Sequence, residues 1–306
     1  MVGRKLKGAT IGDWVIVLIM IGIILMCILP VLTVVANSLS DPGAIVRQQV
    51  TFIPRLEVLE DGGDRLFPIG ARFDAYVDIL SDSRFMRSLG WTIILTFIAT
   101  IFSLVMTVLC AYPLTYDNLK GRGFITVAVI FTMYFQAGWI PTFVLYRDLG
   151  LLDNRWVLVL PGFISVFLLI IMRKFFLGIP DSLRESAEID GAGPFRILAR
   201  IYLPLSTPVL ATVGLMYAVG RWNGFTDALW FLRSAPEWHP IQLVLFNILQ
   251  GIVPIDPMDP GMAAAPGRSE TVQAAAIVVA MVPILCVYPW LQKYFVSGVT
   301  LGAVKG

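Results

Sequence analysis

The chain has 306 residues, of which 57% are hydrophobic and 14% are charged, and its mean hydropathy is +0.79. A soluble domain carries roughly 25% charged residues, so this composition excludes an ordinary soluble protein and indicates a polytopic membrane protein. The formal net charge of +2 says little by itself, and the placement of the charges along the chain is more informative.

The first predicted membrane span covers residues 14–38. Arg4, Lys5 and Lys7 precede a charge-free stretch that continues to Ser40. This stretch is too long for the hydrophobic region of a cleaved signal peptide, and it is not followed by an evident cleavage site. We therefore expect a retained helix with the N-terminus in the cytoplasm.

A polar loop of mixed charge follows at residues 40–87, and we expect it on the outer face. Its segment 73–85 has apolar residues at roughly helical spacing and predicts a short helix. Three more spans are expected at 89–116, 124–146 and 156–178. The span at 124–146 is interrupted by Gly138 and Pro141, which disfavour a continuous helix.

A polar and aromatic set lies beside this interruption: Tyr134, Gln136 and Trp139. Helix breaks within a membrane are tolerated where they line a cavity, so this set is a candidate for the wall of a substrate path. The alternative is that the aromatic residues only mark the membrane interface.

A polar island separates the fourth predicted span from the fifth, and we take 181–204 as a loop of defined shape. Pro180 ends the preceding helix, and Ser182 with Glu185 has the spacing of a capping box at the start of a short helix. Gly191 is suited to the left-handed residue that ends this helix, and Pro194 is suited to the first turn of the next one. The pattern predicts a compact helical hairpin.

The island resembles the EAA loop of the membrane subunits of ABC importers. The resemblance is carried by Glu185-Ser186-Ala187, Asp190-Gly191-Ala192 and Leu203-Pro204, with serine where the family pattern has alanine. It implies that this loop is a coupling helix that docks into a cleft of a cytoplasmic ATPase subunit. The alternative is an ordinary capped loop between two spans. The residues carried over as ATPase-coupling are Glu185, Ser186, Ala187, Asp190, Gly191, Ala192 and Pro204.

The fifth span is expected at 205–230 and contains a second polar cluster: Arg221, Trp222, Asn223 and Asp227. Charges in the membrane usually face a protein interior or an aqueous path, so this cluster is a candidate for sugar contacts. The alternatives are a structural pair of Arg221 with Asp227, or an arginine that reaches to the interface.

An outer loop at 234–270 leads to the sixth span, expected at 271–292, and to a short tail. The segments predicted to be cytoplasmic carry twelve basic and six acidic residues, and every short inner loop is basic. Both termini are therefore expected in the cytoplasm. The three cysteines lie in apolar runs and the single histidine makes a histidine-based metal centre implausible, so no metal site is expected.

The predicted fold class is all-α, with six transmembrane helices and the cytoplasmic loop in a single domain of residues 1–306. Together with the tail QKYFVSGVTLGAVKG, the chain resembles maltose-type (MalG-like) carbohydrate permeases, most closely the branch for oligosaccharides and polysaccharide fragments, such as an alginate importer subunit. Membership implies a second permease subunit, two ATPase subunits that bind ATP and magnesium, an extracytoplasmic solute-binding protein and a location in the bacterial cytoplasmic membrane. No cofactor on this chain and no nucleic-acid partner are implied.

Three alternatives remain open. One is an ABC permease for a solute other than a sugar. A self-sufficient secondary transporter is expected to show inverted repeats with matched broken helices, and the sequence shows no such repeat. A membrane enzyme needs a nucleophile, an acid pair or a metal set, and the polar residues in the spans are too scattered to form one. No P-loop motif is present either, so ATP hydrolysis is expected on partner subunits.

Overall fold

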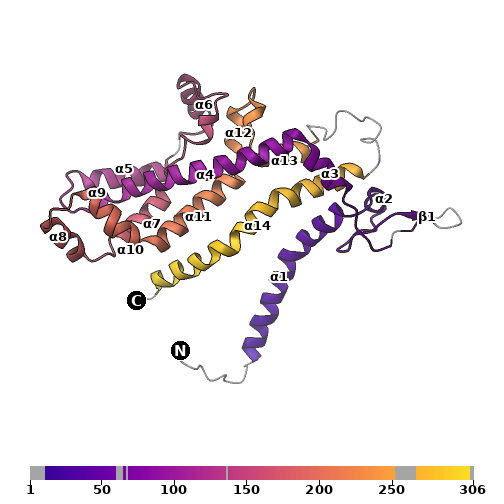
Figure 1. The fold of residues 1–306 in the computed structure, drawn as a ribbon, viewed down its shortest axis with the longest axis horizontal. Helices are drawn as coiled ribbons and strands as arrows, with labels where there is room; N and C mark the ends of the chain where they lie inside the picture. Colours follow the sequence, from indigo (N-terminus) through magenta and orange to yellow (C-terminus); the bar gives the residue numbers. More distant parts are fainter. Residues whose placement is uncertain (1–10, 60–64, 67, 136, 252–266, 304–306) are drawn as a thin grey trace. The chain divides into compact units, whose positions relative to one another are not determined.

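A computed structural model describes residues 11–59, 65–66, 68–135, 137–251 and 267–303. The chain divides into two compact units (Figure 1). The first holds residues 1–86 and 247–281, and the second holds residues 87–246 and 282–306.

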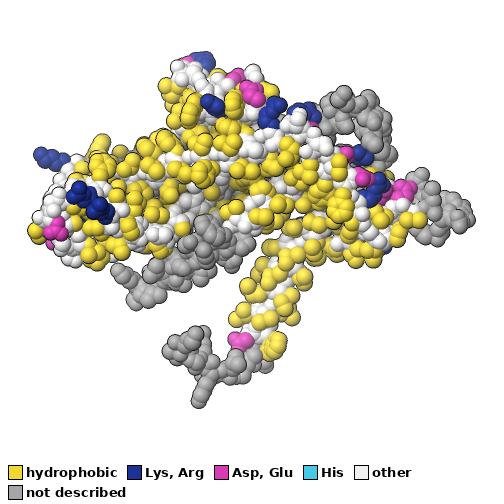
Figure 2. All heavy atoms as spheres, in the orientation of Figure 1, with side chains coloured by type: hydrophobic (Ala, Val, Ile, Leu, Met, Phe, Trp, Pro, Cys, Tyr) yellow, Lys and Arg dark blue, Asp and Glu magenta, His cyan; other side chains and the backbone are white. Residues whose placement is uncertain are grey.

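Helix α1 (Ile11–Ser38) opens the first unit, and its surface is apolar on all sides. Its most apolar window has none of its residues buried within the protein, and Figure 2 shows hydrophobic side chains covering almost all of it. A helix that is hydrophobic all round and unpacked against its own chain is typical of contact with lipid or another subunit.

A small polar subdomain follows α1. It contains α2 (Pro42–Val46), the strands β1 (Val58–Leu59) and β2 (Arg65–Leu66), and α3 (Asp74–Ser81). The strands are antiparallel, with Val58 opposite Leu66, and they are a departure from the all-α prediction. The helix predicted within 73–85 is confirmed by α3 and by the start of the next helix at Ser83.

Ion pairs hold this subdomain together. Arg72 pairs with Asp74 and donates to the Asp41 carboxylate at 2.6 Å, and these hydrogen bonds raise the pKa of the guanidinium above its ordinary value. Asp41 also accepts from the Gly43 amide and so caps α2. Farther along the chain, Arg268 at the start of α14 (Arg268–Ala303) pairs with Asp78 of α3 at 2.6 Å. The polar loop is therefore an ordered structure rather than a simple connection.

The second unit is helical. Its elements in the first part of the unit are α4 (Ser83–Ala111), the 3-10 turn η1 (Pro113–Thr115), α5 (Arg122–Tyr134), α6 (Trp139–Asp148), the 3-10 turn η2 (Arg155–Leu158), α7 (Val166–Phe176) and α8 (Asp181–Ile189). They are followed by α9 (Pro194–Ile197), the π-helical turn η3 (Leu198–Tyr202), α10 (Leu203–Leu205), α11 (Thr207–Asn223), α12 (Thr226–Phe231), the 3-10 turn η4 (Pro236–Trp238) and α13 (Ile241–Leu249). Helix α4 begins and α13 ends in the first unit, and α14 passes from the first unit into the second at Val282.

Three helices in the described part of the chain are long and apolar enough to cross a membrane, at Gly12–Ser38, Ser83–Thr115 and Arg268–Val287. Two bent pairs raise the number to five if each pair is counted as one span: Arg122–Tyr134 with Trp139–Asp148, and Pro194–Leu205 with Thr207–Asn223. The six predicted spans are thus not all long continuous helices.

Two of the predicted spans need correction as helices. Within 156–178, the regular helix α7 begins only at Val166, because Pro161 and Gly162 interrupt the chain and Ser165 caps the new helix through its side chain. Within 205–230, α11 ends at Asn223 and α12 begins at Thr226, with Gly224 and Phe225 between them. Although both segments are apolar enough for a continuous span, proline and glycine at these places interrupt the helix.

The described part of the outer loop predicted at 234–270 contains two elements that were not expected, the short turn η4 and helix α13. The Ile241 amide at the start of α13 donates to the Thr92 hydroxyl of α4 at 2.7 Å. Residues 252–266 of this loop lie outside the described residues.

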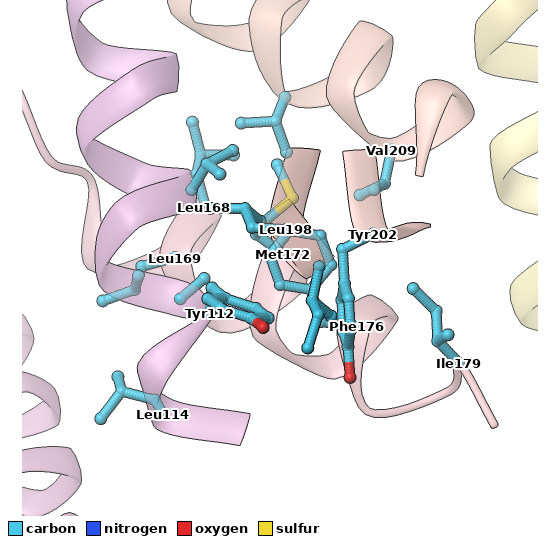
Figure 3. Packing of buried hydrophobic residues seen from close by; sticks show 14 of the residues in the cluster. Tyr112, Leu114, Leu168, Leu169, Met172, Phe176, Ile179, Leu198, Tyr202 and Val209 are labelled. Carbon is cyan, nitrogen blue, oxygen red and sulfur yellow. The ribbon is translucent and has the colours of Figure 1, made fainter. Parts of the chain in front are cut away.

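A hydrophobic core lies at the end of the second unit nearest to α8 (Figures 1 and 3). Tyr202 stacks edge-on against both Tyr112 and Phe176, with ring centroids 4.9 and 5.5 Å apart. Figure 3 shows these rings together with Met172 and Leu198. The core joins α4, α7 and the segment 194–205, and residues 181–193 pack against it through Ala187 and Ala192.

Candidate functional site

Helix α8 begins two residues earlier than the sequence predicted. Pro180 occupies the N-cap position in place of Ser182, and Asp181 is the first helical residue. The predicted capping box of Ser182 with Glu185 is therefore wrong, because Ser182 already lies inside the helix. The acidic side chain of Asp181 in the first turn takes over part of this role, since it lies near the positive end of the helix dipole.

The end of α8 is as predicted. Gly191 has a positive φ of 75° and follows the last helical turn. Its amide donates to the Glu188 carbonyl at 3.0 Å, and the Ala192 amide donates to the Ala187 carbonyl at 2.9 Å. These two bonds form a Schellman motif, which satisfies carbonyls that the helix leaves without partners. Pro194 then opens α9 in the first turn, also as predicted.

The return segment of the hairpin is irregular. It passes from α9 through the π-helical turn η3 to α10, and an 85° bend separates it from α11. Pro208 cannot donate to the Pro204 carbonyl, and the Thr207 hydroxyl donates to that carbonyl instead, at 2.9 Å. Prolines and their compensating hydroxyl thus fix the angle at which the hairpin leaves the helical unit.

The hairpin (residues 181–204) has an inner and an outer face. Ala187 and Ala192 are half-buried and pack against the core, whereas Glu185, Ser186, Asp190, Gly191 and Pro204 are exposed. Two large apolar side chains are exposed beside them, Ile189 to 86% and Phe195 to 78%. Burial also raises the pKa of the Tyr202 hydroxyl beneath the hairpin. Six of the seven residues predicted for ATPase coupling therefore lie in α8 or in the turn at Gly191 that ends it. The seventh, Pro204, lies farther along the hairpin.

The residues of the second predicted cluster, in the fifth span, differ in their surroundings. Arg221 donates to the Leu158 carbonyl at 2.8 Å and to the carbonyls of Pro161 and Gly162 at 3.3 Å. Trp222 is buried and Asn223 is exposed. The predicted alternative of an Arg221–Asp227 ion pair is not formed in the part of the chain that the structure describes. Arg221 instead holds the interrupted segment before α7.

Two cavities meet at Asp227. One has a volume of about 370 Å³ and is lined by Arg221, Tyr217 and Asp227 among others. The other, of about 470 Å³, is lined by Trp139, Tyr146 and Asp227 together with parts of α5 and α6. Trp139 also packs against Trp230, with ring centroids 5.0 Å apart. The structure thus brings one residue of each predicted group, Trp139 and Asp227, to the same cavity.

The remaining predicted residues are less informative. Tyr134 is exposed at the end of α5 and does not line either cavity. Gln136 lies outside the described residues. Within the described residues, no group of three or more His, Cys, Asp or Glu side chains is placed to hold a metal ion.

Residues 8–301 match a protein family described as the inner membrane component of binding-protein-dependent transport systems. The chain belongs to this family. This membership confirms the resemblance inferred from the island, and it makes the chain a component of a membrane transport system rather than an enzyme.

Several relatives of this inner membrane component align with nearly its whole length. YtcP of Bacillus subtilis (strain 168), named as a polygalacturonan/rhamnogalacturonan transport system permease protein, is 39% identical, with 92% of this chain and 94% of YtcP covered. LplC of the same organism is 37% identical, with 98% of this chain and 97% of LplC covered. A chain in the crystal structure of a bacterial ABC transporter involved in the import of the acidic polysaccharide alginate is 32% identical, with a TM-score of 0.81 over 94% of this chain and 99% of that one.

The sequence analysis did not identify the residues that connect the hairpin to the helices beneath it. Tyr112 and Tyr116 lie four residues apart at the end of a charge-free span, and Arg184 lies on the inner side of α8. The tyrosine spacing places both rings on one helical face, which is the signal that could have identified them.

Proposed function

We propose that this chain is the permease subunit of a binding-protein-dependent ABC importer and forms half of a path for oligosaccharides across the cytoplasmic membrane. The match over 94% of the chain to a subunit of the alginate importer carries this proposal. YtcP, at 39% identity, is also named for acidic polysaccharides. Acidic oligosaccharides are therefore the substrate class that we propose.

The hairpin is the proposed coupling element. Its exposed Ile189 and Phe195 offer apolar area to a partner, and Glu185, Ser186 and Asp190 offer polar contacts around it. An apolar centre with a polar surround is typical of protein interfaces. We propose two ATPase subunits that bind ATP and magnesium, one of which receives this hairpin in a cleft, together with a second permease subunit and an extracytoplasmic solute-binding protein.

We further propose six membrane crossings with both termini in the cytoplasm. The three long apolar helices, the bent pair of α5 and α6, and α11 with α12 support five of them, and we assign the remaining crossing to α7 with its irregular approach. The excess of basic residues in the segments predicted to be cytoplasmic supports this orientation.

The cavities at Asp227 are the proposed contribution of this chain to the substrate path. Trp139 and Tyr146 offer aromatic faces on which sugar rings stack, and Asp227 accepts hydrogen bonds from hydroxyls. Arg221 donates to three carbonyls and also lines the smaller cavity, so its remaining N–H donors and its positive charge lie beside that cavity. We propose that it contributes to the substrate path there.

The test is purification of the tagged chain after coexpression with a partner permease and an ATPase subunit from the same organism, followed by reconstitution with the solute-binding protein. We expect the ATPase to copurify and labelled oligogalacturonates to enter proteoliposomes only with ATP and the binding protein. Trp139→Ala should lower uptake severalfold, while Trp14→Ala on α1 serves as the matched control and should not. Uptake that needs neither ATP nor a binding protein would refute the proposal.

A further inference from the structure

Helix α8 makes one directional contact with the helices beneath it, through Arg184. The guanidinium of Arg184 lies 4.8 Å from the centre of the Tyr116 ring, and only 16% of the arginine side chain is exposed. A guanidinium over an aromatic ring is attracted by the negative face of the ring, and the attraction strengthens as water is excluded. The other inward residues of the hairpin, Ala187 and Ala192, are small and give only apolar contact.

Arg184 is oriented by its own helix. Asp181 lies 3.2 Å from the guanidinium one turn before it, and Glu188 lies 3.7 Å away one turn after it. These pairs occupy the three- and four-residue spacings at which side chains on a helix meet. Both carboxylates are largely exposed and the Arg184 Nε–H has no hydrogen-bond acceptor among the described residues, so these pairs orient the guanidinium without fixing it. Because Arg184 is part of α8, a displacement of α8 also displaces its guanidinium.

Tyr116 connects this contact to the long helix α4. It follows η1, and its hydroxyl is hydrogen-bonded to that of Tyr112, which directly follows the last residue of α4. The rings of the two tyrosines meet edge to face, with centroids 5.3 Å apart, and Tyr112 packs in turn on Tyr202. Arg173 of α7 donates to the Leu114 carbonyl of η1 at 2.9 Å, which holds this turn from the other side.

We propose that Arg184 is a positioning residue that transmits movement of α8 to α4 through Tyr116. The inference rests on the proposed function of the hairpin, and it adds a specific route by which docking of the ATPase reaches one membrane helix. Docking itself uses the opposite, exposed face of the hairpin. Binding of the ATPase and transmission of its movement are therefore separable in this chain.

The experiment compares Arg184→Ala, Tyr116→Leu and Tyr116→Phe in the reconstituted importer, with oligogalacturonate as the probe. Arg184→Ala and Tyr116→Leu should copurify the ATPase at the wild-type level and retain ATP hydrolysis. Uptake should fall roughly three- to thirtyfold, so that more ATP is hydrolysed for each sugar imported. Tyr116→Phe keeps the ring face and the edge-to-face contact with Tyr112 but loses the hydroxyl bond, so uptake should fall less than in Tyr116→Leu. The double variant Arg184→Ala/Tyr116→Leu should be no worse than either single one, because both remove the same contact.

Arg122→Ala is the matched control, because it removes a basic residue that pairs with Asp117 in the turn between α4 and α5 without touching α8. A normal ratio of ATP to sugar in Arg184→Ala and Tyr116→Leu, with the ATPase bound, overturns the transmission route and leaves the docking role of the hairpin intact. A wild-type chain that fails to bind any ATPase overturns both.

Discussion

Gly191 shows how one residue can determine the shape of the candidate site. Its φ of 75° lies in the region that side chains with a Cβ rarely adopt, and a Cβ built there meets no atom within 4 Å. The constraint at this position is therefore conformational and not steric crowding. It comes from the Schellman motif, whose two hydrogen bonds require a left-handed residue between them.

We expect Gly191→Val to distort the hairpin or to leave it strained by roughly 1–2 kcal/mol. The variant should reach the membrane at near-normal levels, because the apolar helices do not depend on this turn. It should lose ATPase copurification or transport while the binding protein keeps its affinity for the sugar. Gly191→Asn is the control, since asparagine tolerates this conformation better, and it should retain more activity. Normal uptake by Gly191→Val with a bound ATPase would exclude the hairpin as the coupling element.

At the scale of elements, the connection of α3 to α14 depends on a pair that is 190 residues apart in the chain. Asp78 and Arg268 are half-buried, and Gly267 immediately before Arg268 lies so close to α2 that a Cβ there would be 2.2 Å from the Pro42 carbonyl oxygen. The polar subdomain and the first turn of α14 are thus joined both by charge and by close backbone approach.

Reversal of either charge, by Asp78→Arg or Arg268→Asp, should lower the free energy of unfolding by about 1 kcal/mol, because like charges then face each other. The double reversal should recover most of the loss. Thermal unfolding of the purified complex measures both effects. Equal destabilisation by the double and single variants would show that the pair makes no net contribution.

Contacts of this kind limit what the sequence could predict. The long apolar helices, the helix within 73–85, the glycine end of α8 and Pro194 at the start of α9 follow from local rules, and they were predicted. The prediction of the capping box was wrong because Pro180 sets the helix start two residues earlier. The partners of Arg221 are carbonyls about 60 residues away, exposed only because Pro161 and Gly162 break a helix. Such partners depend on tertiary structure and have no local signal.

For the whole molecule, orientation in the membrane is the property that the proposed function most needs. We replace the three native cysteines by serine and introduce single cysteines by Arg122→Cys, Glu188→Cys and Val77→Cys. An impermeant thiol reagent applied to intact cells should label only Val77→Cys, because the turn before α5 and the hairpin are proposed to be cytoplasmic. Both shielded positions should become reactive after the membrane is permeabilised. Labelling of Glu188→Cys in intact cells would contradict the proposed arrangement.

The π-helical turn at Leu198–Tyr202 has a consequence for how this segment tolerates changes in length. A π-helical turn accommodates one more residue than an α-helical turn, and removal of one residue would allow regular α-helix to form through it. Because the π-helical turn takes up the extra residue, the side chains beyond a deletion within it would keep their directions, whereas a deletion in regular α-helix would rotate them by about 100°. Val209, Val213 and Tyr217 lie on the buried side of α11, and a deletion within Leu198–Tyr202 would leave them facing their core. A one-residue gap is therefore better tolerated at this turn than in the regular helix α11.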